Sequence, residues 1–240
     1  MTVDPRSFLY RTLDPDEARA AAHRHLAAHD DGELYLQYAV NEAFGFDDDR
    51  LKTADYNVSS GFGLRGVSGE MTAFAHASEI SAAAIDRAAA TLQLLDPAKG
   101  PHAAPPPRTN AQLYTGEDPL VAIPFADKVA LCQAIDAAAR ARDPRVEQVS
   151  VSLAASWTVI DIVRADGFVA TDVRPLVRLN VQIVAEKNGR REMGFHGLGG
   201  RYDMARLFDE ASWNRAIDIA LDPLEGTTIT AKAGPNSLAV

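Results

Sequence analysis

Residues 59–81 read SSGFGLRGVSGEMTAFAHASEIS, and glycines recur throughout this stretch. Its run GFGLRG matches the dinucleotide-binding pattern G-x-G-x-x-G letter for letter. That pattern binds pyrophosphate only when a helix begins inside it, because the N–H groups of the first turn contact the phosphates. Here extended sequence continues to Phe74, and the next helix can begin only near Ser78. We therefore expect strands that turn around Ser68-Gly69-Glu70, with glycines that allow tight turns or close backbone approach.

The flanking sequence predicts further strands and helices. Residues 33–58 form a long hairpin in this prediction, because apolar residues alternate in ELYLQYAV before the acidic turn Asp47–Asp49. A later strand-rich region contains the turn signals Ala165-Asp166-Gly167 and Asn188-Gly189, the second typical of a type I′ hairpin. The glycine-rich run 194–200 is expected to be a flexible loop. Helical spacing occupies residues 14–29, 78–95, 126–142 and 203–221.

Short turns between consecutive strands require antiparallel pairing, so the fold class is α+β with antiparallel sheets and flanking helices. We divide the chain into an N-terminal strand-and-helix unit over residues 1–95 and a second helix-and-strand unit of the same domain over 120–225. Residues 96–119 carry six of the 13 prolines and are expected to be a linker or surface loop. Residues 226–240 are a divergent tail.

Composition narrows the classes of partner. The chain has 240 residues, of which 47% are hydrophobic and 24% charged, as in ordinary globular proteins. A net charge of −9 disfavours nucleic acid and anionic membranes as partners. The single cysteine, Cys132, cannot form an intramolecular disulfide. No secretory signal and no apolar run long enough to span a bilayer occurs, so we expect a cytoplasmic protein.

The residues give little support for a metal site or a catalytic nucleophile. His23, His25 and His29 cluster on the first predicted helix, and His25 and His29 could share a face. A zinc-peptidase motif needs glutamate directly after its first histidine, and Leu26 occupies that position. We expect a solvated helix face instead. Cys132 lies in an apolar helical pattern and is expected to be a buried core residue.

Arginines gather in the later strand-rich region of this acidic chain, at Arg174, Arg178, Arg190, Arg191 and Arg201. They could bind a carboxylate, such as a peptide terminus or an acidic side chain. Pairing with the chain's own Asp and Glu side chains is the favoured alternative. The candidates for peptide or carboxylate binding are Arg65, Arg174 and Arg178.

Several segments resemble the TldD/PmbA family of metallopeptidases. The most specific are GFGLRGVSGEMTAFA with the following Ile80-Ser81, DVRPLVRL at residues 172–179, and the glycine run that ends in Gly199-Gly200-Arg201. LYTGEDPL at residues 113–120 is also similar to the family. The likeness spans most of residues 30–222 and is closer to the TldD branch than to PmbA.

The resemblance implies peptide hydrolysis at a zinc ion held by an HExxxH helix and a later cysteine. It also implies dimers, homo- or hetero-, often of two related subunits. None of the six histidines here has Glu next and His five residues on, so no catalytic residue or metal ligand is carried over. We expect the N-terminal half of such a peptidase, catalytically incomplete in this chain. The alternatives are a non-catalytic peptide-binding or subunit-pairing module and, resting on GFGLRG alone, a dinucleotide-dependent enzyme.

Overall fold

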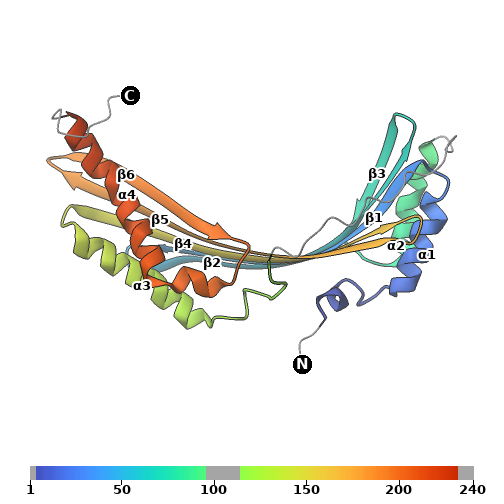
Figure 1. Cartoon of the computed structure of the whole chain (residues 1–240), viewed down its shortest axis with the longest axis horizontal. Coiled ribbons are helices and arrows are strands. Elements are labelled where there is room, and N and C mark those ends of the chain that lie inside the picture. Colours follow the sequence, from blue (N-terminus) through green and yellow to red (C-terminus); the bar gives the residue numbers. More distant parts are fainter. Residues whose placement is uncertain (1–3, 96–113, 232–240) are drawn as a thin grey trace. The chain divides into compact units, whose positions relative to one another are not determined.

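The fold is α+β, as predicted, with one six-stranded antiparallel sheet in the order β3-β2-β1-β4-β5-β6 (Figure 1). The computed structural model describes residues 4–95 and 114–231, without the side chains of residue 94 and residues 222–231. The strands are β1 (Asp31–Asp47), β2 (Arg50–Ser68), β3 (Met71–Ala77), β4 (Val146–Arg164), β5 (Val169–Lys187) and β6 (Arg190–Gly200). The α-helices are α1 (Pro15–Leu26), α2 (Ala82–Ala89), α3 (Phe125–Arg142) and α4 (Glu210–Ala231). Short 3-10 helices are η1 (Pro5–Phe8), η2 (Ala90–Leu94) and η3 (Met204–Phe208).

The predicted turns are confirmed by their backbone angles. Asp48 and Asp49 have φ values of 46° and 58°, and Asn188 and Gly189 have 56° and 78°. Two consecutive left-handed residues are what a type I′ hairpin requires, and Asp and Asn tolerate that region better than most side chains. Gly69 also adopts a positive φ, of 60°, between β2 and β3.

Two glycine-rich segments lie in strands. GFGLRG belongs to β2, whose residues Phe62–Ser68 pair with β3, so the structure bears out the rejection of a phosphate-binding loop. The expectation of a flexible loop over residues 194–200 is wrong, because these residues form the end of β6 and pair with β5. The reason is tertiary contact: a Cβ at Gly194 would lie 1.7 Å from the carbonyl oxygen of Ala220 in α4. Glycine here permits close packing rather than flexibility.

Other element boundaries differ in smaller ways. Each half of the chain supplies three strands instead of about four, because the glycine stretch continues β2 and β4 and β5 are each unbroken. The predicted helix 203–221 is η3 followed by α4, and it is interrupted at Asp209, whose carboxylate accepts the Ser212 N–H at 3.0 Å. Most of the expected loop 96–119 and part of the tail 226–240 lie outside the described residues.

The chain divides into two compact units. Unit 1 comprises Met1–Val40, Val58–Leu113 and Thr158–Arg174. Within it, α1 and α2 lie side by side on one face of the strands (Figure 1). Alternate residues of β1, among them Leu34 and Leu36, are fully buried, as a strand with one covered face requires.

A buried carboxylate holds the first residues of unit 1. Asp161 of β4 has no exposed surface and accepts hydrogen bonds from Arg6, from the Tyr10 hydroxyl at 2.6 Å and from the Thr171 hydroxyl at 2.7 Å. Arg6 donates from both Nε and Nη2, at 3.0 and 2.7 Å. The pKa of Tyr10 is raised, first by burial and then by its hydrogen bond to Asp161.

Unit 2 comprises Asn41–Asn57, Tyr114–Trp157 and Pro175–Val240. Helix α4 packs against β6 and α3, and the inward residues of β4 and β5 are buried. Lys128 of α3 is a buried cation whose Nζ lies 2.5 Å from a Glu42 carboxylate oxygen and donates to the Leu120 carbonyl at 2.9 Å. Within the ranges 4–95 and 114–231, each helix is too short or too polar to cross a membrane.

Candidate functional site

The face of unit 1 opposite α1 and α2 contains a hollow of about 490 Å³. Side chains at alternate positions of β1 point to this face, because their neighbours are buried on the helix side. Residues of β2 and β3 complete the lining. The main contributors are Glu33, Tyr35, Gln37, Arg65, Phe74 and His76. A hollow of this size, lined mostly by polar side chains beside the Phe74 ring, has the dimensions of a small-ligand or side-chain pocket.

Phe74 is the most exposed apolar group at this hollow, with 58% of its surface accessible. Its ring lies over Gly63 of the neighbouring strand, where a Cβ would come within 2.9 Å of a ring carbon. It also stacks on His76, with ring centroids 5.8 Å apart. The glycine in GFGLRG therefore makes room for an aromatic ring on the open face of the sheet.

Arg65 lies at this hollow, and carboxylates of the chain itself bind it. Its Nε and Nη2 donate to the two Glu33 oxygens at 2.8 Å each, and Nη2 also donates to Asp31 at 3.0 Å. Arg164 contacts Asp31 at 2.8 Å. The pKa of Arg65 is raised, chiefly by the hydrogen bonds to Glu33. Burial tends to raise the pKa of Asp31, but Arg65 and Arg164 together hold it below its usual value.

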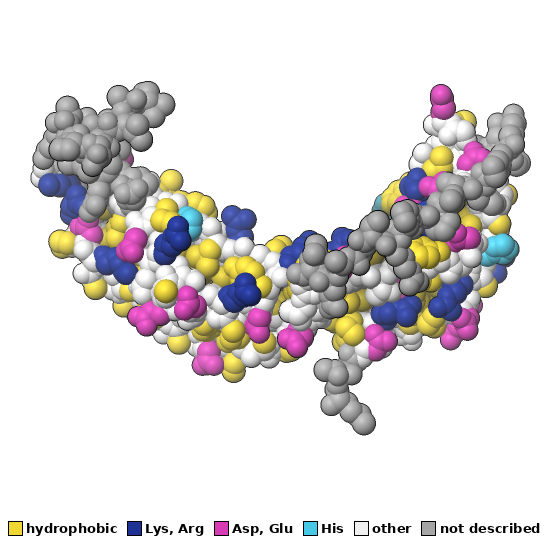
Figure 2. Space-filling view, in the orientation of Figure 1, with side chains coloured by type: hydrophobic (Ala, Val, Ile, Leu, Met, Phe, Trp, Pro, Cys, Tyr) yellow, Lys and Arg dark blue, Asp and Glu magenta, His cyan; other side chains and the backbone are white. Residues whose placement is uncertain are grey.

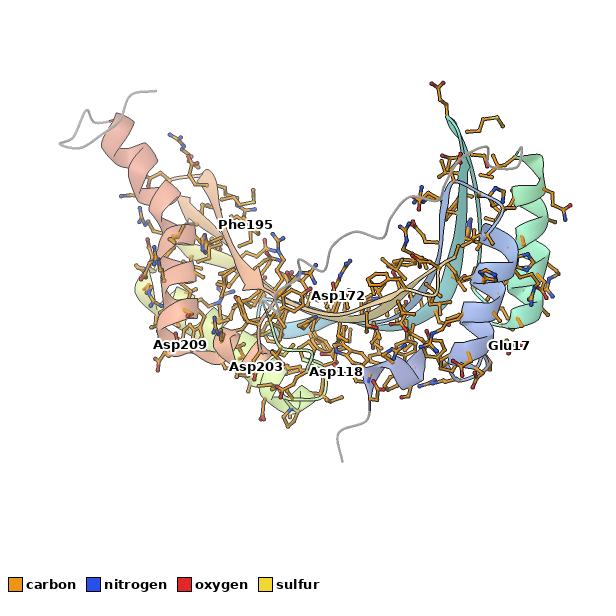
Figure 3. All side chains as sticks on the ribbon, turned by 45° about the vertical axis from the view of Figure 1, so that its right-hand side comes forward. Glu17, Asp118, Asp172, Phe195, Asp203 and Asp209 are labelled. Atoms are coloured by element: carbon orange, nitrogen blue, oxygen red, sulfur yellow. The ribbon has the colours of Figure 1, made fainter. Side chains whose placement is uncertain are left out.

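The other two predicted arginines differ in their surroundings. Arg174 lies in unit 1 and donates to its neighbour Asp172 at 2.5 Å (Figure 3 labels Asp172). Burial raises the pKa of Tyr35, and the positive charge of Arg174 partly opposes this rise. Arg178 lies in unit 2, where its Nε donates to the Asn180 side-chain oxygen at 2.8 Å. The face shown in Figure 2 has acidic and basic side chains interspersed, which agrees with these local pairings.

The histidines do not fit a zinc site. His25 contacts the Asp86 carboxylate at 2.6 Å, and His23 contacts the Ala165 carbonyl at 2.9 Å. No group of three His, Cys, Asp or Glu side chains suited to a metal occurs in the part of the chain that the structure describes. The prediction of a solvated face is wrong for His29, because α1 ends at Leu26 and the imidazole is buried. Burial lowers the pKa of His29.

Cys132 is buried, as predicted, and burial raises the pKa of its thiol to about 11. A thiol of this kind is a poor nucleophile at neutral pH. Tyr35, Phe74 and Asp161 were not among the residues predicted from the sequence to have a role. For Tyr35 and Phe74 the available signal was alternation, since each aromatic residue lies in the outward phase of a strand. The sole signal for Asp161 was an acidic residue within the apolar run of β4.

Comparison with known proteins matches two family models. Residues 32–95 match the PmbA/TldA metallopeptidase domain 1, and residues 118–230 match the PmbA/TldA metallopeptidase central domain. The metalloprotease TldD homolog of Haemophilus influenzae is 33% identical over 192 residues, which cover 78% of this chain and 39% of that protein. The homolog of Buchnera aphidicola subsp. Schizaphis graminum is 34% identical over 174 residues, or 72% of this chain and 36% of that protein.

Solved structures agree at the level of the fold. A Bacteroides thetaiotaomicron protein named as a candidate modulator of DNA gyrase superposes with a TM-score of 0.68 at 16% identity, covering 92% of this chain and 50% of that chain. TldE from Thermococcus kodakarensis gives a TM-score of 0.60 at 14% identity, over 84% of this chain and 46% of that chain. The chain spans about two-fifths of the length of the curated relatives it matches. From the two matched domains and the identity to the TldD homologs, we conclude that the chain belongs to the TldD/PmbA metallopeptidase family.

Proposed function

We propose that this chain forms the N-terminal, peptide-facing part of a TldD-like zinc metallopeptidase and is catalytically incomplete by itself. Relatives are named metalloproteases, and residues 32–95 and 118–230 of this chain match the family's domain 1 and central domain. Zinc bound in a full-length family member would supply a Lewis acid that activates water for peptide hydrolysis. His23 contacts the Ala165 carbonyl, His25 contacts the Asp86 carboxylate and His29 is buried, so we assign these three histidines no step in that chemistry.

The observation that supports a peptide-facing role is the hollow on the open face of unit 1. Phe74 offers an exposed ring that packs against Gly63, and Tyr35 and Gln37 provide hydrogen-bonding groups nearby. The Tyr35 hydroxyl donates to the Gln37 side-chain oxygen at 2.7 Å, which fixes both side chains. A preorganised aromatic surface beside fixed polar groups suits an extended peptide with an apolar side chain. A cytoplasmic location is part of this proposal.

A chimera tests the assignment. The 192 residues of the Haemophilus influenzae homolog that align with this chain are replaced by the corresponding residues of this chain. We expect the chimera to bind zinc and to hydrolyse an unstructured peptide, and the 240-residue chain alone to do neither. A folded, zinc-loaded chimera without activity would contradict the assignment. Stoichiometric zinc and hydrolysis in the chain alone would contradict catalytic incompleteness.

A second candidate function is a non-catalytic peptide-binding or subunit-pairing module. The exposure of Phe74 supports it, because an exposed aromatic ring on an uncovered sheet face is a frequent anchor of protein interfaces. Sedimentation of the chain alone, and mixed with the full-length homolog, separates a homodimer from a heterodimer. Phe74→Ser is expected to weaken whichever complex forms through this face. A monomeric chain that binds neither the homolog nor unstructured peptide would exclude the module.

A further inference from the structure

Unit 2 has its own open face, formed by β5 and β6 opposite α4. The even-numbered residues of β5 point to this face, because Val177, Leu179 and their alternating partners are buried beneath α4. The register pairs Arg178 with Gly199 and Asn180 with Gly197. An arginine and an amide on β5 thus face two β6 positions that lack side chains.

Arg178 is oriented by neutral groups. Its Nε donates to Asn180 Oδ1 at 2.8 Å, and Asn180 Nδ2 donates to the Ser152 hydroxyl at 2.9 Å. A Cβ at Gly197 would lie 2.7 Å from Asn180 Oδ1 and 3.3 Å from Arg178 Nη2. The glycine therefore gives the guanidinium space to lie toward β6. Its terminal nitrogens keep the fork geometry that suits a carboxylate.

The charge balance distinguishes Arg178 from three nearby arginines. Arg174, Arg190 and Arg191 form ion pairs with Asp172, Glu192 and Glu186, respectively. Arg178 forms no ion pair within residues 4–95 and 114–231. In a chain with net charge −9, an exposed and oriented guanidinium held by an amide is complementary to an external carboxylate.

An aromatic ring borders the same position. Phe195 is 51% exposed and points away from α4 (Figure 3). Its ring lies 3.6 Å from the place where a Gly197 Cβ would be, so the ring and the Arg178 guanidinium approach the same point. Leu176, also exposed, follows on the same face of β5. A cationic anchor thus lies directly beside apolar surface.

We infer that this face of unit 2 binds the C-terminal carboxylate of a peptide whose last residue is apolar. Arg178 binds the carboxylate, and Phe195 contacts the terminal side chain. The C-terminal residue carries a carboxylate and a side chain on one carbon, which matches the close approach of guanidinium and ring. An acidic side chain carries its carboxylate at its tip, so its own residue offers nothing for the ring. The inference rests on the proposed peptide-facing function.

Fluorescence anisotropy with the 240-residue chain tests the inference. Three labelled ten-residue peptides share one unstructured sequence: one ends in leucine with a free carboxylate, one in leucine amide, and one in glutamate amide. We expect the free acid to bind at least about tenfold more tightly than the leucine amide, since charge-assisted bidentate hydrogen bonds are of that strength. Equal binding of these two peptides, or no binding of either, overturns the inference. If the peptide that ends in glutamate amide binds as tightly as the free acid, the site recognises an acidic side chain and not a C-terminal carboxylate, which also overturns the inference.

Variants assign the preference to the residues. Arg178→Gln is expected to abolish the preference for the free acid, and Arg178→Lys to reduce it because the fork is lost. Arg190→Gln, on the same hairpin, is the matched control and should keep it. Phe195→Ser should keep the carboxylate preference but lower the preference for the leucine free acid over a fourth labelled peptide, which ends in glycine with a free carboxylate. A carboxylate preference that survives in Arg178→Gln overturns the inference. Because no step requires hydrolysis, an inactive chimera would leave this result unaffected.

Discussion

Replacing Asp161 by alanine would test how the first residues of the chain are held to unit 1. The carboxylate is fully buried and accepts four hydrogen bonds, two from Arg6 and one each from Tyr10 and Thr171. Alanine would leave the Arg6 guanidinium and the Tyr10 hydroxyl facing a space without an acceptor. A buried donor that loses its partner bears its desolvation cost without compensation, so the loss should be large for a single substitution.

The magnitude follows from burial. Removing one member of a buried ion pair costs about 3–5 kcal/mol, and a hydrogen bond to a charged group contributes about 1.5–3 kcal/mol. The Arg6 side chain is 34% exposed and regains water, which places the expected loss near the lower end, at about 3 kcal/mol. Urea unfolding followed by circular dichroism measures the free energy of unfolding. Hydrogen exchange over residues 4–13 should show the largest loss of protection.

Asp86→Ala is the matched control, because Asp86 also binds an arginine but in an exposed pair with Arg24. Such pairs contribute about 0–1 kcal/mol. A loss in Asp161→Ala no larger than that of the control would refute the argument from burial. Asp161→Asn keeps an acceptor without the charge and should give an intermediate loss.

Three further substitutions test other parts of the fold, each by equilibrium unfolding in urea. Lys128→Met removes the cation beside Glu42 and should cost about 3 kcal/mol, whereas a neutral outcome would show that the buried carboxylate gains protons or water without penalty. Gly194→Ala places a methyl group against the Ala220 carbonyl and should cost about 3 kcal/mol, and unchanged stability would mean that α4 can shift freely. Burial lowers the pKa of His29, so its contribution to stability is complete above about pH 6.5 and is lost as pH falls through the lower folded-state value. His29→Gln should flatten the dependence of stability on pH between 7 and 5, and an unchanged slope would assign it to other groups.

The parts of the fold that depend on local sequence were predicted well. The acidic turn at Asp48-Asp49 and the hairpin at Asn188-Gly189 need left-handed backbone, which short sequence patterns reveal. Alternation placed β1, because burial of one face of a strand repeats every two residues. Each of these features is determined by residues within a few positions of one another, so a short stretch of sequence is enough to predict it.

The errors came from contacts between distant residues. The run 194–200 has the composition of a loop, but α4 approaches it so closely at Ala220 that only glycine fits. His29 was placed on a helical face by its spacing from His25, yet α1 ends at Leu26 and the side chain turns inward to the Ser68 hydroxyl at 3.1 Å. No local sequence pattern predicts which helix will cover a strand, or where a helix ends when it packs against neighbouring elements.

The candidate arginines show the same limit for function. The sequence suggested Arg65 and Arg178 equally as candidates for carboxylate binding. In the structure their hydrogen-bond partners differ. Glu33 and Asp31 neutralise Arg65, which leaves Phe74 as the distinctive exposed group on the open face of unit 1. Arg178 is held by an amide and keeps its charge for a ligand.

Each open face contains a glycine that an aromatic ring approaches, Gly63 beside Phe74 and Gly197 beside Phe195. A Cβ at Gly63 would come within 2.9 Å of the Phe74 ring, and one at Gly197 within 2.7 Å of Asn180 Oδ1, so both glycines shape binding surface rather than loops. The two faces then differ in charge: carboxylates balance the guanidinium in unit 1, while the guanidinium in unit 2 has only neutral partners within the described residues. Apolar side chains therefore suit the first face, and an apolar group joined to a carboxylate suits the second. Gly63 lies in the run that matched a dinucleotide-binding pattern, and Gly197 lies in the run expected to be a loop. In the proposed function, both glycines help a chain with net charge −9 to present aromatic and cationic surface to a peptide.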